Sequence, residues 1–123
     1  MTILHLKKKW FNLIKSGEKK EEYRKLNDYY IKRLAPGYRV FYGPPGIVFF
    51  NDKTYEMKKI LLIENVKLVL GYPKKGDTTK EIIFKKALLS VGTGKEEWGA
   101  NPNEYYLIIR NFEGEKNDGI NLL

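Results

Sequence analysis

The chain has 123 residues, 42% hydrophobic and 14% aromatic, which is enough for one hydrophobic core and too little for two ordinary domains. It has no cysteine and a single histidine, His5, so disulfides, thiolate metal sites and imidazole clusters are excluded. A formal charge of +8 favours a polyanionic partner. We expect one domain over residues 1–123 with a fraying tail at 114–123, and neither metal nor cofactor.

The first part of the chain predicts alternating strands and helices. Trp10, Leu13 and Ile14 recur at helical spacing, and Gly17 suits the left-handed residue that ends a helix. Asn27 or Asp28 can cap the next helix. The expected elements are a strand at residues 2–6, a helix at 8–16, a strand at 20–24 and a second short helix that Pro36-Gly37 ends.

The rest of the chain has the pattern of β-structure, with strands separated by Gly, Pro or Asn. Residues 107–109 are apolar at consecutive positions, which indicates that both faces of that strand are covered. The expected strands are 39–42, 47–50, 55–70, 82–91 and 105–112. The sequence therefore predicts an α+β fold: a small mixed β-barrel of about five to six strands flanked by two or more short helices.

An ordered group of charges lies between Gly17 and Arg24, directly after the first helix. On a strand, residues two apart share a face, so Glu22 and Arg24 project together and Tyr23 projects to the other side. Lys19 is out of phase with Glu22. It can join that pair only by reaching from the turn at Gly17 or through a bulge.

These residues resemble the G-x-K-x-x-E-x-R signature of the ASCH domain family. At the four fixed positions of that signature, this sequence has Gly17, Lys19, Glu22 and Arg24. The segment at 10–17 is similar to the helix that precedes the signature in this family. The segment at 22–34 is similar to a branch of the family found in phage and prophage proteins. Residues 97–100 and 105–108 are similar to the closing Trp-Gly element and last strand of that branch. The middle, residues 43–92, carries no diagnostic match.

The resemblance implies a PUA-like barrel and a cleft that binds RNA or a nucleotide, with six ligand-binding residues: Gly17, Lys19, Glu22, Tyr23, Arg24 and Trp98. One branch of the family resembles an amidohydrolase that acts on N4-acetylcytidine with a lysine, a threonine and a glutamate. Lys19 stands at the lysine position and Glu22 at the threonine position, and Glu81 could be the distant carboxylate. Lys19 and Glu22 would be the catalytic residues of such an amidohydrolase or of a ribonuclease. A protein-interaction module of phage or host is the third alternative.

Simpler interpretations compete at each position. Lys19 and Glu22 could be a solvated surface pair, and Arg24 could pair with Glu22 structurally or bind the ligand. We expect an exposed Lys19 that serves the ligand and adds little stability. Tyr29, Tyr30, Tyr42 and Tyr72 could stack on bases, whereas His5 fits a structural role.

The remaining expectations concern the partner, the cellular location and the oligomeric state of the protein. Lysine supplies 19 of the 23 cations, and the four arginines are Arg24, Arg33, Arg39 and Arg110. Because base readout relies on arginine, charge alone leaves RNA binding and an ordinary basic surface equally open. The first ten residues lack a long apolar region, and no later stretch has the length of a bilayer span. We expect a cytoplasmic monomer that does not contact membranes.

Overall fold

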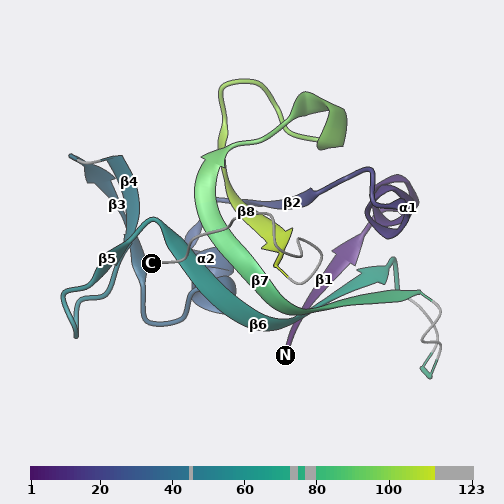
Figure 1. Cartoon of the computed structure of the whole chain (residues 1–123), viewed down its shortest axis with the longest axis horizontal. Helices are drawn as coiled ribbons and strands as arrows, with labels where there is room; N and C mark the ends of the chain where they lie inside the picture. Colours follow the sequence, from purple (N-terminus) through teal and green to yellow (C-terminus); the bar gives the residue numbers. More distant parts are fainter. Residues whose placement is uncertain (45, 73–74, 77–79, 113–123) are drawn as a thin grey trace.

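The chain forms two β-sheets and two α-helices, shown in Figure 1 as a computed structural model that describes residues 1–44, 46–72, 75–76 and 80–112. The tail expected at 114–123 lies outside the described residues. The elements in chain order are β1 (Thr2–Leu6), α1 (Lys8–Ser16), β2 (Glu21–Lys25), α2 (Asp28–Leu34), β3 (Arg39–Gly43), β4 (Gly46–Phe50), β5 (Met57–Lys58), β6 (Ile60–Leu70), β7 (Glu81–Thr93), the 3-10 helix η1 (Glu96–Trp98) and β8 (Tyr105–Asn111).

The larger sheet has five strands in the order β1-β6-β7-β8-β2. β1 runs parallel to β6 and the other pairs are antiparallel, so the sheet is mixed. The long strands β6 and β7 curl the sheet into a half-barrel (Figure 1). Asn65, within β6, has a φ of 56°, outside the extended region, yet β6 keeps the same register with β7 on both sides of it, with Glu64 opposite Lys86 and Val66 opposite Phe84. The predicted α+β class and small mixed barrel with flanking helices are confirmed.

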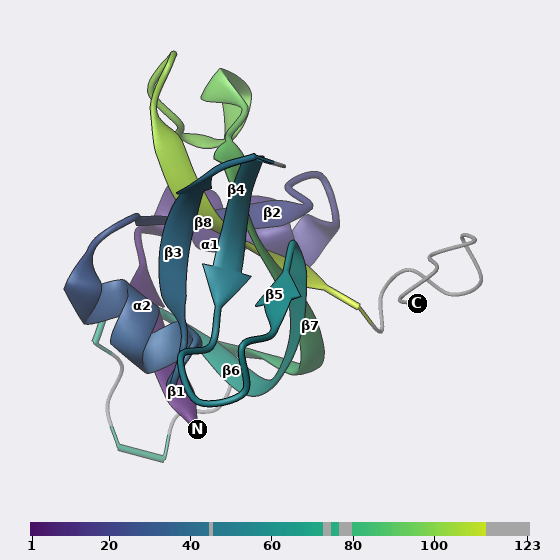
Figure 2. The same cartoon turned by 90° about the vertical axis from the view of Figure 1, so that its left-hand side faces the viewer.

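The three-stranded sheet β3-β4-β5 stands beside the half-barrel, and Figure 2 shows it face on. Residues 55–70 were expected to form one strand, and this prediction is wrong. Tyr55 has a φ of 60° and its N–H donates to Asn51 O at 2.7 Å, which closes a turn. The segment therefore divides into β5, which pairs with β4, and β6, which crosses into the larger sheet.

Local signals set both helices. Gly17 ends α1 with a φ of 87°, and Asn27 caps α2 by accepting a hydrogen bond from the Tyr30 N–H at 3.0 Å. α1 buries Phe11 and α2 buries Leu34, so each helix covers the core with one face. In the part of the chain that the structure describes, no helix is long and apolar enough to cross a membrane.

Both faces of β8 are covered, as its consecutive apolar residues predicted. Leu107 and Ile109 belong to the main core, while Ile108 packs on the opposite face with Tyr106 and Ala100. β2 pairs with β8 in a register that sets Glu22 opposite Ile109 and Arg24 opposite Leu107. Glu22 and Arg24 therefore share a face with the core residues of β8. The buried core consists of Leu4, Leu6, Phe11, Leu34, Ala35, Phe49, Leu61, Val66, Leu68, Phe84, Ala87, Leu89, Leu107 and Ile109.

Candidate functional site

The turn between α1 and β2 determines where Lys19 lies. The Gly17 N–H donates to Ile14 O at 3.1 Å, and the Lys19 N–H donates back to Leu13 O at 2.9 Å. Lys19 is thus tied to the end of α1 two residues before β2 begins. Lys19 therefore reaches Glu22 from the turn at Gly17 and not through a bulge in the strand, and its side chain points inward toward Glu22.

Glu22 is the centre of a buried ion triad. Lys19 Nζ donates to Glu22 Oε1 at 2.7 Å, and Arg24 Nη2 donates to Glu22 Oε2 at 2.7 Å. The same Nη2 donates to His5 O at 2.9 Å, which ties β2 to β1. The side chains of Lys19, Glu22 and Arg24 are 1%, 8% and 15% exposed. Both carboxylate oxygens are engaged, so the solvated surface pair considered from the sequence is not what forms.

Aromatic rings cover the ammonium end of the triad. Lys19 Nζ lies 4.8 Å from the centre of the Trp10 ring and 5.6 Å from that of the Tyr23 ring. Ring faces attract cations, so these contacts offset part of the cost of desolvating Lys19. The backbone after η1 closes over Trp10, because a Cβ on Gly99 would lie 3.0 Å from its ring.

The expectation of an exposed, ligand-facing Lys19 is therefore corrected. Lys19 is the most buried of the three charged residues, since the turn directs it beneath Trp10. Arg24 is instead the member of the triad that reaches a pocket. Its Nε is buried and has no hydrogen-bond partner among the described residues, while Nη2 makes both of the bonds given above.

The pocket beside Arg24 has a volume of about 560 Å³ and lies between β1, α2 and the segment after β6. Among the described residues that line it, the charged ones are Arg24 and Arg33, and none is a carboxylate. Eight residues line it: Ile3, Leu4, His5, Arg24, Tyr29, Tyr30, Arg33 and Tyr72. The pocket is therefore both cationic and aromatic.

The polar side chains of this pocket are held in place. His5 Nδ1 lies 2.6 Å from Gly71 O, and because a carbonyl oxygen only accepts, Nδ1 carries the proton. The ring of Tyr72 stacks on that of His5, with centroids 4.2 Å apart. Arg33 Nη1 donates to Tyr29 Oη at 3.0 Å and Arg24 lies over the Tyr30 ring at 5.8 Å. The site is organised by its own contacts.

Tyr23 and Trp98 lie outside this pocket. Tyr23 packs on the opposite face of the sheet, where its hydroxyl donates to Glu21 Oε1 at 2.8 Å and accepts from the Lys95 N–H at 3.0 Å. Burial of the ring, reinforced by the Glu21 carboxylate, raises the pKa of Tyr23. Trp98, at the end of η1, has Lys95 Nζ over its ring at 4.4 Å. The binding roles expected for these two residues stay predictions.

Two pocket residues had not been assigned to the site from the sequence. His5 is exposed because it alternates with buried Leu4 and Leu6 along β1, a signal that could have been used. Arg33 follows Tyr29 by four residues on α2, the spacing of one helix face. Glu81, the possible distant carboxylate, pairs with Lys67 at 3.0 Å. Within the described ranges, no three His, Asp or Glu side chains are grouped to hold a metal.

Comparison of the chain with family models, curated proteins and solved structures found no match in any of the three. The resemblance to the ASCH family stays a prediction that rests on the signature residues. What the fold adds is the geometry of that signature, in which Gly17 ends the helix and Lys19, Glu22 and Arg24 meet.

Proposed function

We propose that this protein binds RNA or a nucleotide in the pocket beside Arg24. The observation that carries the proposal is the juxtaposition, in one concavity of about 560 Å³, of two guanidiniums with tyrosine and histidine rings. Volumes of about 300 to 1,000 Å³ are usual for small-molecule sites. The net charge of +8 acts in the same direction by attracting a polyanion.

The chemistry of the lining suits both parts of a nucleotide. Guanidiniums bind phosphate oxygens in a planar, two-pronged manner, and aromatic rings stack on bases. Tyr72 presents the most accessible ring, being 87% exposed and already stacked on His5. A base on Tyr72 and a phosphate at Arg24 or Arg33 would use the exposed ring and a guanidinium of the pocket together.

Binding is favoured over hydrolysis by the place of the two candidate catalytic residues. Lys19 and Glu22 lie behind Arg24 and do not line the pocket, and both oxygens of Glu22 are engaged by cations. A general base needs direct reach to the reacting group. The triad is better suited to holding Arg24 in position than to chemistry on a ligand in the pocket.

The test measures binding of fluorescently labelled single-stranded RNA of about ten nucleotides at low salt, together with nucleoside monophosphates as competitors. Tyr72→Ala removes an exposed ring and is expected to weaken binding about 5- to 100-fold, the usual effect of losing one base stack. Tyr55→Ala is the matched control, because Tyr55 is 78% exposed, also contacts a neighbouring ring and lies outside the pocket.

Two results would overturn the proposal. One is absence of binding by the parent protein at low salt to RNA and to every nucleotide. The other is an equal loss in Tyr72→Ala and Tyr55→Ala, which would show that the ligand does not use this pocket.

A further inference from the structure

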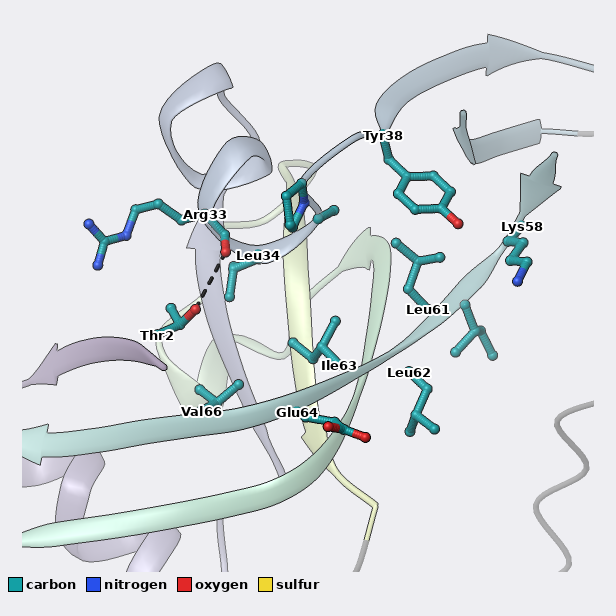
Figure 3. Close-up of a pocket in the computed structure, with 13 residues that line it drawn as sticks. Thr2, Arg33, Leu34, Tyr38, Lys58, Leu61, Leu62, Ile63, Glu64 and Val66 are labelled. Carbon is teal, nitrogen blue, oxygen red and sulfur yellow. Dashed lines mark hydrogen bonds between the residues drawn. The ribbon is translucent and has the colours of Figure 1, made fainter. Parts of the chain in front are cut away.

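A second pocket of about 450 Å³ lies on the other side of α2, against β6 (Figure 3). The side chains of Tyr38 and Leu61 point toward one another within it. Because eight of the thirteen described residues that line it are apolar, we call it the apolar pocket, although Arg33, Lys58 and Glu64 also bring charged groups to it. The lining consists of Thr2, Arg33, Leu34, Ala35, Pro36, Tyr38, Lys58, Ile60, Leu61, Leu62, Ile63, Glu64 and Val66. Apolar side chains with a few polar groups among them suit a flat aromatic group.

Arg33 belongs to both pockets and connects them. Its backbone oxygen accepts from Thr2 Oγ1 at 3.4 Å inside the apolar pocket, while its guanidinium extends away from that pocket (Figure 3). The guanidinium bonds to Tyr29 Oη at 3.0 Å and to Ile3 O at 3.4 Å, both residues of the Arg24 pocket. Thr2 and Ile3 are consecutive in β1, so the two pockets adjoin across one arginine.

We propose that the ligand is a single-stranded oligonucleotide that occupies both pockets at once, an inference that rests on the proposed function. One base stacks in the Arg24 pocket, the linking phosphate lies at Arg33, and the next base enters the apolar pocket beside Tyr38. Arg33 is the cation that the two linings share, so the linking phosphate is placed there, and the apolar side chains around Tyr38 are left for the base. Aromatic platforms spaced by cations are the common means of holding single strands.

A length series tests the proposal. Affinity is measured for a nucleoside monophosphate, a dinucleotide and oligonucleotides of about four and about eight residues. Binding in both pockets predicts a rise of roughly fivefold or more from the mononucleotide to the oligonucleotide of about four residues, the least that one added stack usually contributes. Binding in the Arg24 pocket alone predicts equal affinities apart from the charge of added phosphates.

Matched variants locate the added contact. Ile60→Glu places a carboxylate in the apolar lining at a residue 47% exposed, and Ile83→Glu makes the same change on β7 at a residue 49% exposed that lines neither pocket. Ile60→Glu is expected to lose the gain with length and to keep mononucleotide binding. Ile83→Glu is expected to keep both.

The outcomes separate this inference from the proposed function. If no ligand binds the parent protein, both fail together. If the mononucleotide binds as tightly as the oligonucleotides, or if Ile60→Glu and Ile83→Glu behave alike, the function stands and the two-pocket ligand is refuted. A dimer of the parent protein in sedimentation that Ile60→Glu abolishes would assign the apolar pocket to a second copy and would also overturn the inference.

Discussion

Replacing Glu22 by Gln is expected to remove a large part of the stability of this protein. Glu22 is the only anion between two cations whose side chains are 1% and 15% exposed. Glutamine has one acceptor oxygen, so its amide NH₂ would face either Lys19 or Arg24, donor against donor. Stranding a buried charge costs about 3 to 5 kcal/mol, against a total stability of about 5 to 15 kcal/mol for a typical domain.

Urea unfolding followed by circular dichroism measures this loss. With a slope of about 1.5 kcal/mol per molar, the midpoint of Glu22→Gln is expected to fall by about 2 to 3 M urea. Asp52→Asn is the matched control, because Asp52 pairs with Arg39 at 3.0 Å in the open, with side chains 62% and 55% exposed. That exposed pair should contribute at most about 1 kcal/mol.

Lys19→Met completes the comparison, because it leaves Glu22 paired with Arg24 and so should cost less than Glu22→Gln. The reasoning is refuted if Glu22→Gln shifts the urea midpoint no more than Asp52→Asn does, since the triad would then behave as solvated. It is also refuted if Lys19→Met is the more damaging of the two triad variants.

Three further outcomes are expected. Gly94→Ala should lower stability by about 1 to 3 kcal/mol in thermal melts, because its Cβ would lie 2.7 Å from Ala100 Cβ and 2.8 Å from the Tyr23 ring; a parent-like melt would contradict this contact. Tyr23→Phe should flatten the alkaline loss of stability. Burial raises the folded pKa of Tyr23, so the unfolded state releases its proton first and stability falls above about pH 10; an unchanged profile in urea melts would exclude Tyr23 as the cause. The logarithm of RNA affinity should fall linearly with that of salt concentration in titrations, and a flat line would argue against phosphate contacts.

The local features of this fold follow from the sequence. The helix at residues 8–16, its end at Gly17 and the cap at Asn27 each depend on residues within one or two turns, and all three predictions are confirmed. The shared face of Glu22 and Arg24 follows from strand alternation and is also confirmed, since both bear on one core face. Short-range rules suffice wherever the partners are neighbours in the chain.

The errors about the site concern contacts between distant segments. The burial of Lys19 depends on Trp10 and on the backbone at Gly99, which lies 80 residues after it in the printed numbering. The Arg24 pocket depends on the parallel pairing of β1 with β6 and on the placement of α2, so local pattern could mark His5 as exposed and Arg33 as sharing a face with Tyr29 but could not bring them into one pocket. Charge and periodicity describe a segment, and they do not say which other segment covers it.

In the proposed function, the triad would support binding by holding Arg24 in place, even though Lys19 and Glu22 do not line the pocket. A free arginine side chain loses considerable rotamer entropy when a ligand orders it. Glu22 and His5 O already hold Arg24 through Nη2, and Lys19 balances the second oxygen of the carboxylate, so that entropy is lost on folding. Lys19 is the most buried member of the triad and Arg24 is the member that lines the pocket. The buried ion pairs therefore hold the guanidinium of Arg24 in one orientation at the pocket before a ligand binds. A signature spaced as Lys19, Glu22 and Arg24 can therefore serve a ligand through its last member alone.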